Sequence, residues 1–265
     1  ILIAGLIASI IGYISYRQMR DRPNVSLWSD IANALKGVLG GITGAPTAGT
    51  FIAFEGGEGT GKSTQALILA EILKKHDVKV VLTREPGGSP GAEIIRNLLV
   101  TGSVDRWSTM SEVLLMYAAR ADHWQNTIQC ALAQGSWVLC DRFADSTVAY
   151  QGYGRGVDQE FLQLLYKYIV GDVQPDCTFV FDLDVDEGLK RATARMEGNT
   201  VVEGRFEAMD IAFHKRIRAG FLEIAKKNSN RCTVLQANAH PQEIHRKILN
   251  ILHEKGVLPW NNLLA

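Results

Sequence analysis

Residues 56–64 read Gly56-Gly57-Glu58-Gly59-Thr60-Gly61-Lys62-Ser63-Thr64, and they match the phosphate-loop pattern G-x-x-x-x-G-K-[ST] from Gly56 to Ser63. Glycines allow backbone angles that a Cβ forbids, so successive N–H groups can turn inward around a phosphate. The lysine of such a loop reaches the β- and γ-phosphates of a nucleotide, and the hydroxyl beside it ligates Mg²⁺. The helix expected to begin here also directs its positive end toward the anion.

The residues on either side of this loop support the same interpretation. Phe51–Phe54 is a short apolar run that predicts a buried strand. Residues 65–75 carry apolar side chains at helical spacing and end in two lysines, as a helix after the loop requires. The order strand, glycine loop, helix therefore predicts that all nine residues, 56–64, bind ATP, rather than forming a glycine-rich connection that binds nothing.

Composition limits the other classes of function. The 265 residues are 46% hydrophobic and 21% charged, which suits a globular protein with one good core. Lys+Arg and Asp+Glu each number 28, so no basic excess points to nucleic acid. The four cysteines include no C-x-x-C pair, and we expect reduced, buried thiols in a cytoplasmic protein rather than zinc ligands or disulfides.

The first 49 residues form a separate predicted region. Ile1–Tyr16 is almost wholly apolar, and the first charged residue is Arg17. Four interpretations of this run stay open. It is the end of a membrane-spanning helix that tethers the chain to the inner membrane, a signal-peptide core, a helix packed on protein, or an artefact of gene prediction. The arginines that follow would keep the downstream residues in the cytoplasm. Asn24–Leu39 predicts a short amphipathic helix, and residues 40–49 predict a flexible glycine-rich linker.

The globular domain is expected to span residues 50–265, where strand-like and helical patterns alternate. Strands are predicted at Phe51–Glu55, Val78–Thr83, Trp137–Asp141, Thr178–Leu183 and Thr233–Gln236. Helices are predicted at Lys62–Lys75, Ala92–Val100, Ser111–Gln134, Gln159–Val170, Glu187–Met196, Glu207–Lys227 and Pro241–Glu254. This alternation predicts an α/β fold of the P-loop NTPase type, in which helices cover both faces of a five-stranded parallel sheet.

Polar residues follow the predicted strands, and we expect them to converge on one cleft because parallel α/β sheets bind ligands at the carboxyl ends of their strands. These ends are Glu55-Gly56, Arg84 to Gly88, Asp141-Arg142 and Asp182 to Asp184. Arg84 and Arg142 suit the capture of a second phosphate, and Asp141 is placed to hold Mg²⁺ directly or through water. The alternatives are an ion pair of Arg84 with Glu85 or Asp141 and a strand-end ion pair at residues 141 and 142.

Two further groups of polar residues are candidates for the acceptor substrate and for a lid. Ser146, Thr147, Tyr150 and Gln151 can present hydroxyls and an amide to one small molecule, and Met116 and Arg120 share a helix face. A methionine at helical spacing is more often part of the core than a ligand contact. Arg191, Arg195 and Arg205 flank the polar, glycine-containing stretch Met196–Gly204, which predicts a basic lid over the transferred phosphoryl group. The alternative is a solvated basic helix face.

Several motifs in order resemble bacterial thymidylate kinase, and the resemblance extends from about Phe51 to His253. The motifs are Phe54–Thr64, Thr83-Arg84-Glu85-Pro86-Gly87-Gly88, Tyr117-Ala118-Ala119-Arg120, Asp141-Arg142 and Tyr150-Gln151-Gly152. The resemblance implies transfer of the γ-phosphoryl of ATP to dTMP, giving dTDP and ADP, with Mg²⁺ and as a homodimer.

The resemblance also implies a role for each site residue. The loop residues 56–64 bind the ATP phosphates, and Ser63 and Asp141 serve the metal. The catalytic group comprises Lys62, Arg84, Asp141, Arg142, Arg191, Arg195 and Arg205. The substrate group comprises Glu58, Arg84, Pro86, Met116, Arg120, Arg142, Ser146, Thr147 and Gln151.

The chain departs from this family's pattern at two places. Met116 stands where members commonly have a phenylalanine on the thymine ring, and a thioether orients a base less strictly. Ordinary members also lack the first 49 residues. Two alternatives therefore stay open, a kinase for another nucleoside monophosphate and a membrane-tethered nucleotide-binding module without turnover.

Overall fold

A computed structural model gives the structure of residues 49–196 and 204–258, which belong to one compact unit, Ala48–Ala265. Its strands are β1 Phe51–Gly56, β2 Val80–Arg84, β3 Trp137–Asp141, β4 Cys177–Asp182 and β5 Cys232–Gln236. Its α-helices are α3 Lys62–Lys75, α4 Pro90–Val100, α5 Thr109–His123, α6 Gln129–Ala133, α7 Ala144–Thr147, α8 Gln159–Ile169, α9 Val185–Met196, α10 Ile211–Lys227 and α11 Pro241–Glu254. Two π-helical segments are η1 Trp124–Ile128 and η2 Val148–Gly154.

Two predicted features fall on residues that the structure does not describe. These are the N-terminal region, apart from Gly49, and residues 197–203 of the predicted lid. Within the described residues, no helix combines the length and the apolar character that crossing a membrane requires.

The five strands form one parallel sheet in the order β2-β3-β1-β4-β5, which confirms the predicted fold class. Strand β1 lies at the centre, and its side chains alternate between the two faces, as a buried parallel strand requires. Ile52 and Phe54 pack against one helical layer, and Phe51 and Ala53 pack against the other. The phosphate loop thus leaves the sheet at its centre.

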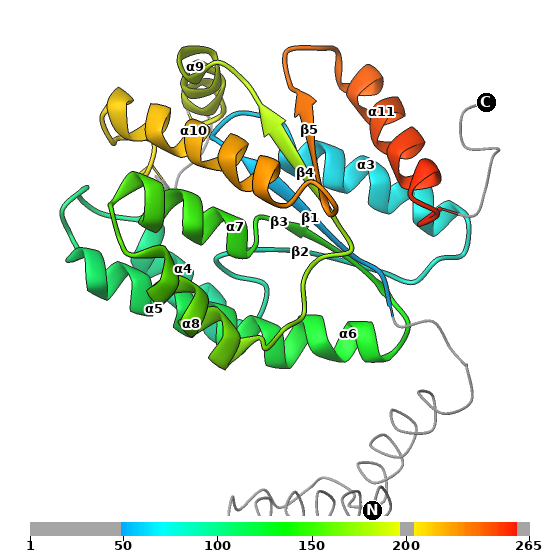
Figure 1. The fold of residues 1–265 in the computed structure, drawn as a ribbon, viewed down its shortest axis with the longest axis horizontal. Helices are drawn as coiled ribbons and strands as arrows, with labels where there is room; N and C mark the ends of the chain where they lie inside the picture. The colour runs from blue at the N-terminus through cyan, green and yellow to red at the C-terminus, as the bar shows by residue number, and fades with distance from the viewer. Residues whose placement is uncertain (1–48, 197–203, 259–265) are drawn as a thin grey trace, which may run out of the picture. The chain divides into compact units, whose positions relative to one another are not determined.

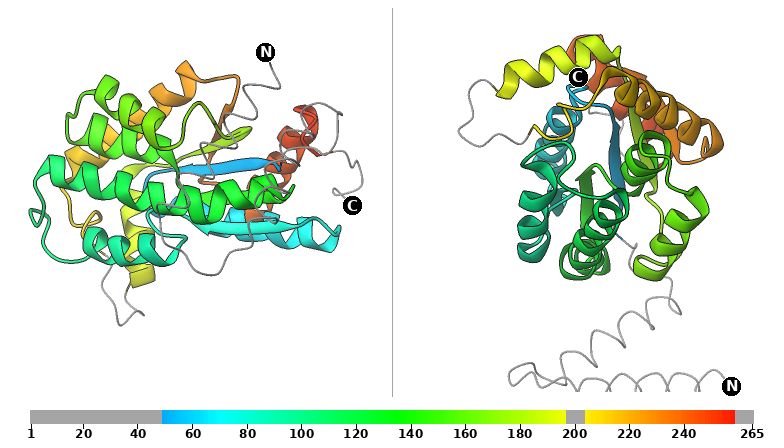
Figure 2. Two further views of the ribbon diagram at one scale, coloured as in Figure 1. Left: turned by 90° about the horizontal axis from the view of Figure 1, so that it is seen from below. Right: turned by 90° about the vertical axis from the view of Figure 1, so that its left-hand side faces the viewer.

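Helices cover both faces of the sheet (Figures 1 and 2). On one face, α3 and α11 bury their apolar sides; Ala66, Leu69, Ala70 and Leu73 follow the three- and four-residue spacing of one helix face. On the other face, α5, α6 and α8 pack over β1 and β3, and α10 packs over β4 and β5. Burial of each large apolar side chain contributes roughly 1.5–3 kcal/mol, so these two layers hold the strand ends in place.

The helical segments differ from the prediction at two places. The helix predicted at Ser111–Gln134 is interrupted by η1, so α5 ends at His123 and α6 begins at Gln129. Residues 144–154 form α7 and η2, which the sequence did not predict because Val148, Gly152 and Gly154 are poor helix formers. Packing against α10 stabilises this segment, since Gly154 leaves room for the ring of Phe213 and Tyr153 covers Gly220. π-Helical turns are frequent at functional sites.

All four cysteines are free thiols, as expected. Cys140, Cys177 and Cys232 lie in strands and are buried, whereas Cys130 in α6 is exposed, contrary to the prediction. Of the five residues of α6, Ala131 is buried and Leu132 packs against the same core cluster, whereas Cys130 is exposed.

Candidate active site

A cleft of about 550 Å³ opens at the carboxyl ends of β1, β2 and β3. It brings together most of the residues that the sequence predicted for one site: Glu58 to Thr64, Arg84, Pro86, Met116, Arg120, Asp141, Arg142, Ser146, Thr147, Gln151 and Arg195. Its lining does not include Gly56, Gly57, Arg191 or Arg205. The expected convergence of strand ends therefore holds for β1, β2 and β3.

The phosphate loop has the backbone that its glycines predict. Gly56, Gly59 and Gly61 adopt φ angles of 139°, 67° and 87°, which L-residues with a Cβ rarely adopt. A Cβ on Gly59 would lie 2.0 Å from the carbonyl oxygen of Gly188, so this glycine also allows the close approach of α9. Gly61 is the N-cap of α3 and has no side chain to cap it, which leaves the first N–H groups of the helix for an anion.

Lys62 lies folded back inside this loop. Its Nζ donates to the carbonyl oxygen of Gly57 at 2.6 Å and to Thr60 Oγ1 at 3.2 Å. Burial, together with the nearby charge of Arg142, lowers the pKa of Lys62 to about 8. The cation is therefore held at the mouth of the loop in an environment that favours an anionic ligand beside it.

Ser63 and Asp141 meet across the cleft from the start of α3 and the end of β3. The Ser63 hydroxyl donates to Asp141 Oδ2. Among the described residues, Asp141 Oδ1 is buried and has no hydrogen-bond partner. A buried carboxylate oxygen without a partner is costly unless a cation or a water binds it, so this pair of oxygens is suited to a hard divalent cation.

Arg142 lies between the phosphate loop and the segment of residues 144–154. It adopts a φ of 68°, an uncommon conformation for a residue other than glycine and one that recurs at functional sites. Its Nη1 donates to the carbonyl oxygen of Gly56 at 2.7 Å, and its Nη2 donates to Glu58 Oε1 at 2.8 Å. The guanidinium carbon lies 5.0 Å from the ring centre of Tyr150, whose hydroxyl donates to Glu58 at 2.5 Å.

This arrangement controls the charge of Glu58. Burial alone would raise the pKa of Glu58, but Arg142 and Lys62 outweigh burial and lower it to about 2. Glu58 is consequently an anion at neutral pH. Burial works against the charge of Arg142, but Glu58 raises the pKa of Arg142 above its ordinary value. The two side chains form a largely buried ion pair beside the loop.

Arg120 crosses from α5 to the same cleft and is fixed by three acceptors. Its Nε donates to Glu85 Oε2 at 2.8 Å, and its Nη2 donates to the carbonyl oxygen of Phe143 at 3.2 Å and to Thr147 Oγ1 at 2.9 Å. Within the described part of the chain, Arg120 Nη1 is buried and has no partner. Glu85 thus orients a guanidinium whose remaining donor is available to a ligand. The sequence analysis assigned Glu85 no such role, because its partner Arg120 lies 35 residues further along the chain.

The remaining predicted substrate residues occupy distinct parts of the cleft. Arg84 is half exposed and pairs with Glu93 at 3.1 Å rather than with Glu85 or Asp141. Ser146 accepts from Arg142 Nη1 at 3.3 Å. Gln151 is buried, and its Nε2 donates to Glu112 Oε1 at 3.0 Å.

The three arginines assigned to a lid have different environments. Arg195 lies near the end of α9, is exposed and lines the cleft. Arg191 pairs with Glu187 at 2.9 Å and donates to the carbonyl oxygen of Ala237 at 3.2 Å. Arg205 does not reach the cleft lining: its side chain is buried and pairs with Glu112 at 2.6 Å. This corrects the expectation for Arg205, because its guanidinium is already satisfied inside the protein.

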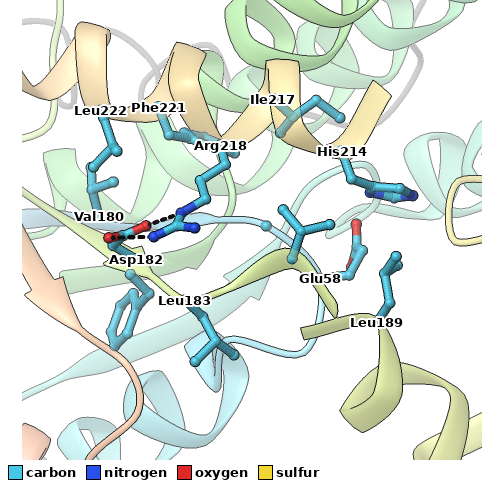
Figure 3. Close-up of a pocket in the computed structure, with 13 residues that line it drawn as sticks. Glu58, Val180, Asp182, Leu183, Leu189, His214, Ile217, Arg218, Phe221 and Leu222 are labelled. Carbon is cyan, nitrogen blue, oxygen red and sulfur yellow. Dashed lines mark hydrogen bonds and ion pairs between the residues drawn. The ribbon is translucent and has the colours of Figure 1, made fainter. Parts of the chain in front are cut away.

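Asp182 at the end of β4 also departs from the expected cleft. It lines a small separate cavity of about 30 Å³ and accepts from Arg218 of α10 at 2.7 and 3.2 Å (Figure 3). Glu58 and His214 lie at the other end of this cavity (Figure 3). Strand β4 lies on the far side of β1 from β3, so its end faces α10 rather than the cleft.

Comparison with known proteins identifies the family. The sequence model of the thymidylate kinase family matches residues 54–248, which include every strand from β1 to β5 except the first three residues of β1. The chain belongs to the thymidylate kinase family. The match begins within β1, just before the phosphate loop, and ends in α11, so it contains the whole cleft.

Individual thymidylate kinases match over nearly their whole length. The thymidylate kinase of Caulobacter vibrioides is 49% identical over 209 residues, which are 79% of this chain and 98% of that protein. The thymidylate kinase of a Bradyrhizobium strain is 47% identical over 210 residues, with 79% and 92% covered. The crystal structure of thymidylate kinase from Ehrlichia chaffeensis superposes with a TM-score of 0.62 at 37% identity and covers 77% of this chain and 99% of the other.

Proposed function

We propose that this chain transfers the γ-phosphoryl group of ATP to dTMP, giving dTDP and ADP. One observation carries the proposal: a single cleft of a thymidylate kinase family member joins a phosphate loop to a second set of cations and hydrogen-bonding side chains. A nucleotide-binding module without turnover needs no second anion site, and nothing in the cleft favours another nucleoside monophosphate. Catalysis in this class rests on positioning and on electrostatic stabilisation of the transferring group.

The phosphate loop is the donor side of this site. The backbone N–H groups of residues 56–64 and the start of α3 hold the ATP phosphates. Lys62 stabilises the negative charge on the γ-phosphoryl group during its transfer. Lys62 already lies beside Gly57 and Thr60, so its ammonium group has only to exchange these contacts for phosphate oxygens.

The acceptor side lies around Arg142 and Arg120. Arg84 and Arg142 bind the phosphate of dTMP, since a guanidinium matches phosphate oxygens in pairs. Pro86, Met116, Arg120, Ser146, Thr147 and Gln151 surround the nucleoside, and Glu58 lies near its sugar. The support is that all these side chains line one cleft and that Arg120 keeps a donor without a protein partner among the described residues.

Mg²⁺ fits beside Ser63 and Asp141. The hydroxyl and the carboxylate are hard oxygen ligands, and Asp141 Oδ1 has no partner within the described residues. When bound, the ion neutralises negative charge on the phosphates of ATP.

Of the lid arginines, Arg195 is the best placed to reach the phosphoryl group because it is exposed at the cleft, and Arg191 is second.

We also propose a cytoplasmic homodimer. Leu114 of α5 and Leu164 and Tyr168 of α8 are exposed, and Tyr168 leaves 82% of its surface open to solvent. The two helices are neighbours, since the Tyr117 hydroxyl donates to the carbonyl oxygen of Leu162 at 2.5 Å. Exposed apolar side chains on adjacent helices suit a face shared by two copies.

The cytoplasmic location rests on the cysteines, since buried free thiols suit a reducing compartment. Membrane contact through Ile1–Tyr16 stays a prediction on residues outside the described ones.

An ATP-consumption assay on the full chain tests the proposed reaction. We expect turnover with dTMP to exceed that with dUMP, dCMP, dGMP and AMP, and to stop when EDTA removes Mg²⁺. Sedimentation of the same preparation should give twice the 29.2 kDa mass of one chain. Binding of ATP without turnover of any monophosphate would instead support the binding-module alternative.

The low pKa of Lys62 predicts a pH effect on ATP use. A lysine is charged below its pKa, so in the free protein the ammonium group is lost as pH rises through about 8. Bound phosphates stabilise the charged form and raise this pKa in the complex. We expect kcat/KM for ATP to fall above about pH 8, whereas kcat at saturating ATP falls only at higher pH. A profile of kcat/KM that stays flat to pH 9.5 would contradict this expectation. Lys62→Arg is the control: its side chain stays charged, so the fall in kcat/KM near pH 8 should be absent.

A further inference from the structure

Glu112 lies beneath the cleft and joins three side chains from distant parts of the chain. It belongs to the first turn of α5 and is fully buried. Its Oε1 accepts from Gln151 Nε2 at 3.0 Å, and its Oε2 accepts from Arg155 Nη2 at 3.0 Å and from Arg205 Nη2 at 2.6 Å. Glu112 does not line the cleft, but Gln151 does.

Two arginines pair with the buried side chain of Glu112. Arg155 and Arg205 both donate to its Oε2 and supply the cations and hydrogen bonds that a buried carboxylate needs. Arg205 is itself anchored, since it donates to the carbonyl oxygens of Leu99 and Ser103 at 3.1 Å each. In all three of these hydrogen bonds the Glu112 oxygens accept, and both oxygens are held in place.

An acceptor-only partner determines which way the Gln151 amide points. The two ends of a glutamine amide have nearly the same shape but opposite hydrogen-bonding character. Glu112 can take only the NH₂ end, so the carbonyl oxygen is the end left for the cleft. Among the described residues, Gln151 Oε1 accepts no hydrogen bond. If the amide were reversed, Gln151 Oε1 would lie against Glu112 Oε1. Two acceptors would then face each other at a buried position, which is costly.

The orientation of the amide has a direct consequence for base recognition. Gln151 follows Thr147 by one helical turn, and Thr147 Oγ1 accepts from Arg120, whose Nη1 is a buried donor without a partner in the described structure. Gln151 and Arg120 both line the cleft, so its lining includes an acceptor, Gln151 Oε1, and a donor, Arg120 Nη1. A pyrimidine with an N–H at position 3 and a carbonyl at position 4 complements this pair; a cytosine base, with a lone pair at position 3 and an amino group at position 4, does not.

We propose that Glu112 is a positioning residue that holds the carbonyl end of Gln151 toward the cleft and thereby selects thymine over cytosine bases. This inference rests on the proposed function, because it assigns the base of the acceptor nucleotide to the region around Gln151. Arg155 and Arg205 act through Glu112 and touch no substrate.

The test compares dTMP with 5-methyl-dCMP, which keeps the shape and methyl group of dTMP but reverses the pattern at positions 3 and 4. In the full-length parent, we expect kcat/KM to favour dTMP by on the order of 10⁴, the discrimination typical of a site that pairs with polar substrate groups. In Glu112→Gln, position 112 can present either end of an amide, so Gln151 can turn. We expect dTMP use to fall and 5-methyl-dCMP use to rise, with a decrease in the ratio of roughly 100-fold.

Opposite changes for the two substrates distinguish positioning from a purely structural role, which lowers the use of both equally. Glu243→Gln is the matched control, since Glu243 undergoes the same chemical change at an exposed pair with Lys247 on α11. If Glu112→Gln does not fold, Glu112→Asp retains the charge beside the arginines but shortens the reach to Gln151, and we expect its ratio to fall about fivefold. A ratio equal to that of the parent in whichever variant folds overturns the proposal.

Binding measurements separate this inference from the proposed reaction. Calorimetry with dTMP and with 5-methyl-dCMP gives the ratio of the two binding affinities, which needs no turnover. A parent that binds dTMP selectively but does not phosphorylate it contradicts the proposed function while leaving Glu112 testable by binding. A parent that binds both nucleotides equally contradicts the role of Glu112.

Discussion

Replacing Lys62 by alanine is expected to lower kcat for dTMP phosphorylation by about 10³-fold, since removing one preorganised donor to a developing charge commonly costs 10²–10³. The ammonium group lies in the phosphate loop, 2.6 Å from the carbonyl oxygen of Gly57, and no other lysine lines the cleft within the described residues. Arg142 lies nearby but belongs to the acceptor side of the cleft, where it pairs with Glu58. It therefore does not replace the lost charge.

The fold should survive this substitution. Burial lowers the pKa of Lys62, which means that the charged form is held at a cost in the free protein. We expect the melting temperature of Lys62→Ala to equal or exceed that of the parent. Lys75→Ala, at an exposed position in the last turn of the same helix, is the matched control and should keep full activity. A kcat within tenfold of the parent would sink the assignment of Lys62 to the transferring phosphoryl group.

Replacing Arg142 by methionine should impair both activity and stability. We expect kcat/KM for dTMP to fall by about 10³-fold, because a guanidinium that pairs with a phosphate forms two charge-assisted hydrogen bonds. The substitution also leaves Glu58 largely buried without its main cation, and breaking such a pair typically costs about 3 kcal/mol. Enzyme kinetics and urea unfolding at pH 7 measure the two effects separately.

The double variant Glu58→Gln/Arg142→Met tells these two effects apart. With the buried carboxylate neutralised, we expect most of the lost stability to return while activity stays low. If activity returned with stability, the role of Arg142 would be structural and not in phosphate binding.

The stability effect should also depend on pH, with a sign set by Glu58. In the parent, Arg142 and Lys62 outweigh burial and lower the pKa of Glu58 to about 2, from an ordinary value of 4.5. A lowered carboxyl pKa adds stability above the ordinary value, and this contribution is lost as pH falls toward 2. The difference between the parent and Arg142→Met should therefore be larger at pH 7 than at pH 4.

The phosphate loop, α3 and the strands could be predicted from short stretches of sequence, because each depends on residues that are close together in the chain. The phosphate loop needs glycines at set positions, and α3 needs one apolar face; both are visible within twenty residues, and α3 lies at the predicted bounds. The strands were predicted to within three residues at each end because buried parallel strands are continuous apolar runs bounded by polar residues. The convergence of the ends of β1, β2 and β3 followed from the geometry of parallel sheets.

The partners of individual side chains could not be predicted in this way. Arg205 carries the same charge as Arg195 and lies near it in sequence, yet one pairs with Glu112, 93 residues away, and the other reaches the cleft. Glu112 and Glu85 looked like ordinary charged residues because their roles exist only where α5, α7 and η2 meet. Asp182 resembles Asp141 as an acid at a strand end, but the order of the strands places it against Arg218.

The phosphate loop, the alternation of strands and helices and the edge of the sheet where ligands bind can be predicted from residue order alone, because hydrogen bonding and burial within a segment decide these features. Which arginines line the cleft, which acid holds Gln151 and which strand ends lie side by side depend instead on the folded chain. Those outcomes depend on side chains that meet across long sequence separations, where a buried charge takes whichever partner the packing of the core brings within reach.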